Sequence, residues 1–161
     1  MLERSRNSTN QDAQLSTVGY GLLVLRVVTG LVFFMHGYQK LFDNGIAATQ
    51  EGFTAMGAPS PDITAVIVTF LELIGGLALI LGVLTPIVGA LLAIDMLGAF
   101  FITHMGNGFF AGTGGYELVL LLGGAAFALV LTGPGMFALD SLVSLPGRAQ
   151  SALNTRPAQR G

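Results

Sequence analysis

The chain has 161 residues, of which 52% are hydrophobic and only 10% are charged, and its mean hydropathy is +0.72. An average soluble domain carries roughly 25% charged residues, so this composition excludes an ordinary soluble domain. A net charge of -2 provides no basic surface for phosphates, which excludes a nucleic-acid binder. The chain has no cysteine, which excludes disulfides, thiolate metal sites and a cysteine nucleophile.

Four long apolar runs follow one another along the chain. A bilayer core of about 30 Å requires about 20 residues of helix. The predicted spans cover residues 18–35, 63–84, 87–103 and 116–132, of which the last is short for a membrane helix. The sequence therefore predicts one all-α integral membrane domain over residues 17–145, folded as a bundle of four transmembrane helices.

Helix-breaking residues mark the ends of these spans. Ser60 followed by Pro61 is typical of an N-cap with proline in the first helical turn. Thr85 and Pro86 leave so little chain between the second and third spans that the two must form an antiparallel hairpin. Residues 72–86 also resemble residues 117–134, which indicates two parallel-repeat hairpins. The alternative is that any two glycine-rich hydrophobic hairpins look alike.

The flanking segments predict the orientation of the domain. Residues 1–16 and 146–161 are polar and are predicted to be disordered tails. Five basic residues flank the spans on the side of the two termini: Arg4, Arg6, Arg148, Arg156 and Arg160. The loops on the other side contain one, Lys40. By the positive-inside rule, both termini are predicted to be cytoplasmic.

Three ionisable residues lie inside the apolar runs, namely Arg26, Glu72 and Asp95. Each costs about 2.5–3.5 kcal/mol at the centre of a membrane helix, so these side chains must face protein, water or one another. Small residues follow each of them at i+3 and i+4: Thr29 and Gly30, Gly75 and Gly76, Gly98 and Ala99. This spacing places the charges on helix-packing faces. Two interpretations follow: Arg26 pairs with a carboxylate to fix helix register, or an unpaired carboxylate relays protons or binds a polar ligand.

A second polar set is predicted near the outer membrane face. His36 ends the first span and His104 ends the third, and both of these spans run outward. Four further residues fall at the same level: Lys40, Asn107, Tyr116 and Glu117. One interpretation is a quinone headgroup held by His and Lys, with its tail against four phenylalanines: Phe33, Phe34, Phe109 and Phe110.

Three alternatives to a quinone site remain open for this outer polar set. The two histidines have the ligand type for a bis-histidine haem. With Glu117, they also have the ligand types for a divalent metal. The fourth interpretation is that these side chains only anchor helices at the level of the lipid headgroups. Haem and metal are less favoured than quinone, because no supporting motif accompanies them.

Several motifs together resemble the DoxX family over about residues 18–143. They are His36-Gly37-Tyr38-Gln39-Lys40-Leu41-Phe42, Glu72-Leu73-Ile74-Gly75-Gly76, His104 with Asn107-Gly108-Phe109-Phe110, Gly115-Tyr116-Glu117, and Thr132-Gly133-Pro134-Gly135 with Leu139-Asp140. The resemblance implies a multi-pass, four-helix protein of the bacterial cytoplasmic membrane that acts as an oxidoreductase or an oxidoreductase subunit. It also implies exchange of electrons with quinone, and links to oxidative stress or to sulfur and thiol detoxification.

The leading functional hypothesis is therefore a quinone-associated membrane redox subunit. In this hypothesis His36, Lys40 and His104, with Asn107, Tyr116 and Glu117, form the headgroup site, and the charges inside the spans move protons or form an ion-paired seam. The partners considered are the lipid bilayer, a quinone, soluble redox proteins and further copies of the chain. One alternative is a non-enzymatic membrane scaffold that recruits soluble partners. Another is a small-molecule transporter, which would require dimerisation.

Overall fold

The structure is a computed structural model that describes residues 2–141, with the side chains of residues 14–140. Within this part of the chain the only regular secondary structure is helical. The longer helices are α1 (Leu2–Tyr38), α2 (Ile46–Ala55), α3 (Pro61–Leu81), α4 (Thr85–Ala99) and α5 (Glu117–Thr132). The shorter ones are the π-helices η1 (Gln39–Asp43) and η2 (Phe100–His104) and the 3₁₀ turns η3 (Met105–Asn107), η4 (Ala111–Thr113) and η5 (Leu139–Ser141).

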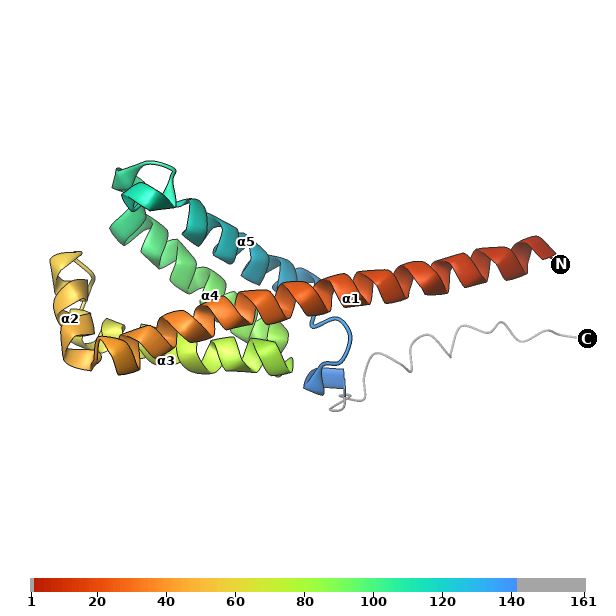
Figure 1. Ribbon diagram of the computed structural model, residues 1–161, viewed down its shortest axis with the longest axis horizontal. Coiled ribbons are helices and arrows are strands. Elements are labelled where there is room, and N and C mark those ends of the chain that lie inside the picture. The colour runs from red at the N-terminus through yellow and green to blue at the C-terminus, as the bar shows by residue number, and fades with distance from the viewer. Residues whose placement is uncertain (1, 142–161) are drawn as a thin grey trace, which may run out of the picture.

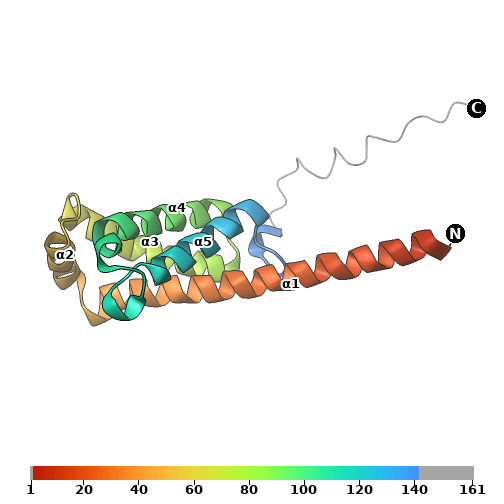
Figure 2. The same cartoon turned by 90° about the horizontal axis from the view of Figure 1, so that it is seen from above.

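Four helices lie alongside one another, and α2 lies across the end of the molecule that is remote from the N-terminus (Figures 1 and 2). Helix α1 packs mainly against α3, and α4 packs mainly against α5. The core between them is apolar: Phe33, Leu79, Leu92, Met96, Val119, Leu122, Ala126 and Leu129. Large apolar side chains also cover the outside of the helices, as expected where the solvent is lipid: Leu31, Ile67, Ile94, Leu121 and Leu131 are all more than half exposed.

Three helical segments are long and apolar enough to cross a membrane, namely Gln14–Asp43, Pro61–Leu81 and Thr85–Asn107. The second begins after Ser60, as its Ser-Pro pattern predicted. The third is α4 extended without interruption through η2 and η3. Helix α5 has 16 residues and at 1.5 Å per residue is about 24 Å long. The predicted class, an all-α integral membrane protein, is confirmed.

Two segments differ from the sequence-based expectation. Residues 2–16, for which a disordered tail was predicted, continue α1 as helix. No glycine or proline precedes Gly19, and extending an existing helix requires no new nucleus. Helix α2 was not predicted, because its ten residues show no long apolar run. The predicted tail at residues 146–161 lies outside the described residues.

Helices α1 and α3 approach each other closely at glycines. A Cβ atom added to Gly37 would overlap the backbone nitrogen of Leu73, and one added to Gly76 would overlap the backbone nitrogen of Phe34. A Cβ atom added to Gly30 would likewise overlap the carbonyl oxygen of Gly76, so the prediction that small residues near Arg26 and Glu72 mark packing faces holds at this interface. It is wrong for Gly98, where an added Cβ would meet no atom within 4 Å.

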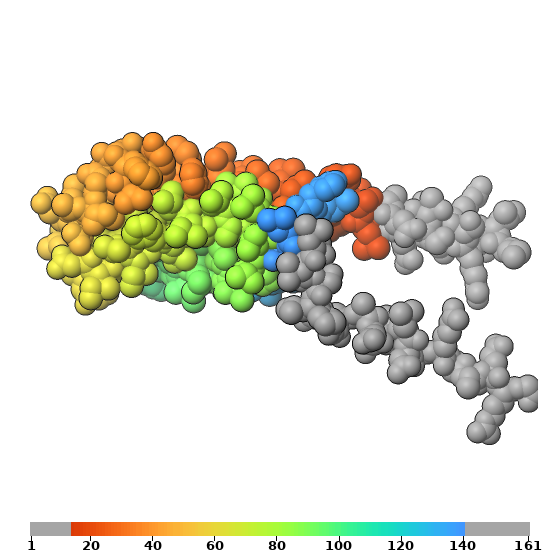
Figure 3. Space-filling view, turned by 90° about the horizontal axis from the view of Figure 1, so that it is seen from below, coloured from red at the N-terminus to blue at the C-terminus, as the bar shows by residue number. Residues whose placement is uncertain are grey.

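Arg26 holds the segment of residues 133–141, called here the C-terminal strap, against the bundle. The residue is 1% exposed, and its guanidinium donates hydrogen bonds to the carbonyl oxygens of Pro134 (2.9 Å) and Phe137 (3.3 Å). Figure 3 shows the blue surface of the strap between the surfaces of α1 and of the α3–α4 end. The predicted pairing of Arg26 with Glu72 or Asp95 is therefore wrong. The cation lies at the strap end of the bundle, where two backbone carbonyl oxygens accept from its terminal nitrogens, while its Nε has no hydrogen-bond partner among the described residues.

Asp140 of the strap caps helix α4. Its carboxylate accepts hydrogen bonds from the backbone N–H groups of Leu84 (2.7 Å) and Thr85 (3.0 Å), and its own N–H donates to the carbonyl oxygen of Gly82 (2.8 Å). The connection between α3 and α4 has only three residues, and Leu84 has a positive φ of 50°. An acidic side chain suits a helix N-terminus. The strap therefore stabilises this tight turn.

The close α1–α3 contact generates a stability prediction. Gly76→Ala is expected to lower the free energy of unfolding by about 1–3 kcal/mol, because the added methyl group overpacks the interface. The matched control is Gly124→Ala in α5, where an added Cβ meets nothing within 4 Å and loss of a helical glycine stabilises by about 0.5–1 kcal/mol. Unfolding of both variants in detergent checks this. Equal effects of the two substitutions would contradict the described packing.

Candidate functional site

A pocket of about 540 Å³ opens at the α2 end of the bundle. Its walls come from α1, α3, α4 and α5, with α2 and the loop after it at the rim. Much of the lining is apolar and includes Phe33, Val68, Met96, Leu118 and Leu122. Five residues with ionisable side chains also line it: His36, Lys40, Glu72, Asp95 and His104. Two charges from inside the spans, Glu72 and Asp95, therefore meet three members of the outer polar set in one pocket.

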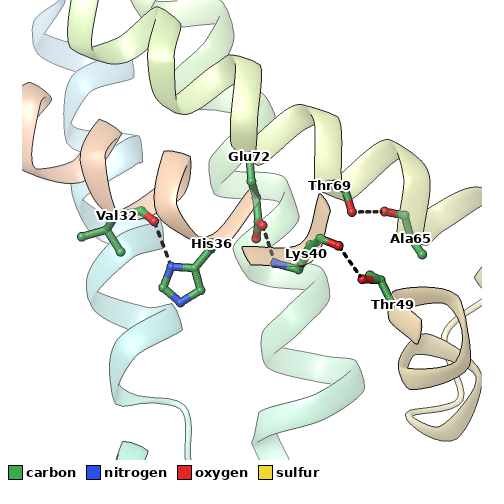
Figure 4. A network of polar contacts seen from close by, with 7 residues as sticks. All are labelled: Val32, His36, Lys40, Thr49, Ala65, Thr69 and Glu72. Atoms are coloured by element: carbon green, nitrogen blue, oxygen red, sulfur yellow. Dashed lines mark hydrogen bonds and ion pairs between the residues drawn. The ribbon is translucent and has the colours of Figure 1, made fainter. Parts of the chain in front are cut away.

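An ion pair between Lys40 and Glu72 joins two helices in the pocket wall (Figure 4). Glu72 lies in the middle of α3 and is 4% exposed, so its charge is stable there only with a partner. Lys40 reaches it from η1, the π-helix that continues α1. The carbonyl oxygen of Lys40 also accepts a hydrogen bond of 3.0 Å from the hydroxyl of Thr49. The same residue therefore connects α1 to α3 and to α2.

Asp95 lies on α4 and interacts electrostatically with both members of this pair. Its Oδ2 atom is buried and has no hydrogen-bond partner among the described residues. Buried polar atoms are nearly always satisfied, and an exception in a pocket is a common sign of a missing ligand or water. The pocket therefore contains two carboxyl groups and one lysine, with the oxygen of Asp95 unsatisfied.

The two histidines line the pocket, and the backbone holds both rings. The Nδ1 atom of His36 lies 2.8 Å from the carbonyl oxygen of Val32 (Figure 4). The Nδ1 atom of His104 lies 2.7 Å from the carbonyl oxygen of Gly114. A carbonyl oxygen only accepts, so Nδ1 donates in both residues. The Nε2 atom of each ring makes no hydrogen bond to another described residue.

Both histidines lie next to π-helical segments. His36 precedes η1 by three residues, and His104 is the last residue of η2. Such segments are rare and occur often at functional sites. They follow the first and third spans at corresponding places, which is what a repeat of two hairpins would produce. The repeat itself remains a prediction.

The remaining predicted site residues do not line this pocket. Asn107 donates from Nδ2 to the carbonyl oxygens of Thr103 (3.1 Å) and Gly114 (3.3 Å), and the second of these also accepts from His104. Tyr116 packs edge-on against Phe100 and Phe109, with ring centroids 5.1 and 5.5 Å apart. Asn107 and Tyr116 therefore shape the loop that holds His104.

Glu117 starts α5 and is outside the pocket lining. Among the residues searched, no group of three or more His, Cys, Asp and Glu side chains could hold a metal ion. The metal interpretation of His36, His104 and Glu117 therefore has no support in the geometry. Of the four phenylalanines predicted to contact a quinone tail, only Phe33 lines the pocket.

Sequence reasoning missed the rim of the pocket. Phe53 and Met56, from α2 and its C-terminal end, also line the pocket. The hydroxyl of Thr103 donates to the sulfur of Met56 at 3.4 Å, which connects this rim to the end of the α4 span. The only sequence signal for α2 was its position between two spans in a loop too long for a simple turn.

Comparisons with known proteins agree with these features. The DoxX family model matches residues 21–105. The chain is 39% identical over 123 residues to the Bacillus subtilis protein named "Putative oxidoreductase CatD", covering 76% of this chain and 87% of that protein. It is 32% identical over 126 residues to the Escherichia coli inner membrane protein YqjF, covering 77% of this chain and 92% of that protein. No solved structure matches the chain.

The family match covers more than half of the chain and includes all five ionisable pocket residues. It extends from the first span to the end of the third, which is the part of the fold that carries His36, Lys40, Glu72, Asp95 and His104. The E. coli inner membrane protein YqjF is matched over 92% of its length. The chain is an integral membrane protein that belongs to the DoxX family.

Proposed function

We propose that this chain is a quinone-associated redox subunit of an oxidoreductase system in the bacterial cytoplasmic membrane, and that its pocket binds the quinone headgroup. The observation that carries the proposal is the single pocket in which five ionisable side chains meet apolar walls. Its volume of about 540 Å³ lies within the usual range of roughly 300–1,000 Å³ for small-molecule sites. The name of the B. subtilis relative supports an oxidoreductase class.

The residues of the pocket fit a ligand that is apolar in bulk and polar at its head. Phe33, Met96 and Leu122 offer contacts to a ring and a tail, while the unsatisfied Oδ2 of Asp95 marks a position where a polar group is required. A quinone, when bound, supplies two-electron chemistry coupled to two protons. Lys40 would hold an oxygen of the headgroup, and Glu72 and Asp95 would hold and pass protons.

The partners of such a subunit are proposed on chemical grounds. The chain has no cysteine, so thiol chemistry in a sulfur or oxidative-stress system would belong to a soluble redox protein. Such a protein would exchange electrons with the quinone at the membrane surface. The lipid bilayer supplies the quinone itself, which partitions into the apolar core that surrounds the helices.

Filling the pocket tests the proposal. Gly98 lines it, and a Cβ added there meets nothing within 4 Å. Gly98→Phe is therefore expected to fold normally and to weaken binding of a ubiquinone or menaquinone analogue at least tenfold, because the ring occupies the headgroup space. Titration of the detergent-purified protein with the analogue measures this.

The matched control is Gly21→Phe on the exposed side of α1. An added Cβ at Gly21 also meets nothing within 4 Å, and Gly21 is outside the pocket lining. This variant should bind the analogue as the parent chain does. Absence of binding by the parent chain, or equal binding by both variants, would refute a quinone site in this pocket.

We also propose that α5 is a fourth transmembrane span and that both termini are cytoplasmic. Helix α5 packs mainly against α4, and its 16 residues suffice where the bilayer thins locally. Five basic residues on the terminal side against Lys40 on the other favour this orientation. The pocket would then open toward the outer face.

Labelling of introduced cysteines tests the topology, because the natural chain has none. A membrane-impermeant maleimide added to spheroplasts is expected to label Ala47→Cys in α2 and Gly112→Cys in η4. It should label Leu139→Cys in the strap only after permeabilisation. Labelling of Gly112→Cys and Leu139→Cys from the same side would show that α5 does not cross the membrane.

A further inference from the structure

The hydrogen bonds of the two pocket histidines fix which ring nitrogen is free. In His36 and His104 the Nδ1 atom faces a backbone carbonyl oxygen at 2.8 and 2.7 Å. A carbonyl oxygen has no hydrogen to give, so Nδ1 carries the proton. In a neutral imidazole the other nitrogen is then an acceptor. In the neutral form each of these pocket-lining rings therefore has a free lone pair at Nε2.

The third unsatisfied group in the pocket is also an acceptor. The Oδ2 atom of Asp95 is buried without a partner among the described residues. A carboxyl oxygen accepts hydrogen bonds when the group is ionised, and a protonated carboxyl group still keeps acceptor capacity. A ligand that brings hydrogens to this oxygen therefore satisfies it in the ionised form, in which the carboxylate only accepts.

Each of the other side-chain donors of the pocket makes at least one hydrogen bond within the protein. The ammonium group of Lys40 donates to Glu72. The hydroxyl of Thr64 donates to the carbonyl oxygen of Pro59, and that of Thr103 donates to the sulfur of Met56. The lining thus combines three free acceptors with one ammonium group, which keeps two N–H donors beyond its bond to Glu72.

We infer that the pocket distinguishes the two redox states of its ligand and binds the hydroquinone, which carries two O–H donors, in preference to the quinone, which carries two acceptor oxygens. The inference rests on the proposed function, since it concerns the same site. His36, His104 and Asp95 are the residues that determine the preference. The oxygens of a quinone only accept hydrogen bonds, so they could not pair with these acceptors of the pocket. The two hydroxyl groups of a hydroquinone would each donate to one of the pocket acceptors.

The test compares the two redox states on one protein. The full chain in detergent is titrated calorimetrically with decylubiquinol under anaerobic conditions and with decylubiquinone. The Kd of the hydroquinone is expected to be about tenfold lower, the factor that corresponds to pairing one buried polar group. Equal affinities, or tighter binding of the quinone, would overturn the inference and leave the proposed function standing. Absence of binding by both forms would refute the proposed function as well.

Two kinds of variant separate a specific role from a structural one. Asp95→Asn keeps the size of the side chain and adds an N–H donor, so it should weaken hydroquinone binding and strengthen quinone binding. In His36→Phe and in His104→Phe the ratio of the two Kd values should move toward one, mainly because the hydroquinone binds more weakly. Tyr38→Phe, on the same helix as His36 and outside the pocket lining, is the control and should keep the preference.

The folded state of each variant is checked by its elution volume and thermal unfolding. Movement of the two affinities in opposite directions in Asp95→Asn is a result that a general loss of structure cannot produce. A parallel loss of both affinities in all three variants would overturn the inference, because it would show that these residues only maintain the pocket. If one histidine variant does not fold, the other and Asp95→Asn still decide the question.

Discussion

The structure depends on the ion pair between Lys40 and Glu72. A lone carboxylate in the middle of an apolar helix is costly, and Glu72 is almost completely buried. Lys40 reaches it because α1 and α3 touch at Gly37 and Gly76, where a side chain on either helix would collide with backbone. The close helix contact and the ion pair therefore require each other, and together they form one wall of the pocket.

The pair also explains why the pocket is polar on the inside. One cation and one carboxylate satisfy each other, which leaves Asp95 as a second carboxyl group close to both. Its free oxygen and the two Nε2 atoms of His36 and His104 make the interior rich in acceptors. Apolar walls around these groups exclude water, which strengthens each polar contact a ligand makes. This arrangement supports a ligand that is mainly apolar and donates hydrogen bonds at its head.

At the other end of the bundle, a separate set of contacts closes the fold. Arg26 binds two carbonyl oxygens of the C-terminal strap, and Asp140 caps α4. These interactions join the last described residues to the first span and to the α3–α4 turn. The cation that the sequence suggested for the functional site thus holds the strap. One end of the bundle stabilises the fold, and the other end carries the pocket.

Much of the fold was predictable from the sequence, because the length and the hydropathy of an apolar run are enough to identify a membrane helix. The helices overlap the four predicted runs, and His36, Lys40 and His104 do lie at one end of the bundle. The choice of partner for Arg26 was not predictable. An apolar run shows which residues lie inside the membrane. It does not fix the depth of Arg26 closely enough to show whether its partner is a carboxylate or a backbone carbonyl oxygen.

The π-helical end of α1 was also beyond prediction, since one extra residue per turn leaves no mark in an apolar pattern. That segment carries Lys40, the partner of Glu72. The sequence therefore placed Lys40 only in the outer polar set and did not pair it with Glu72. Helix α2 was not predicted for a different reason. Short amphipathic segments gain most of their stability from packing, and the packing surface of α2 exists only once α1 and α3 have met.

The most direct test of the account is a double-mutant cycle on the central pair. Lys40→Met, Glu72→Leu and the double variant are compared with the parent chain by their free energies of unfolding in a detergent titration. The account predicts that each single variant is destabilised, since it leaves one charge without its partner, and that the double variant loses at least about 1 kcal/mol less than the sum of the two. Losses that add to within about 0.5 kcal/mol would show that the two side chains do not interact, and would contradict the account.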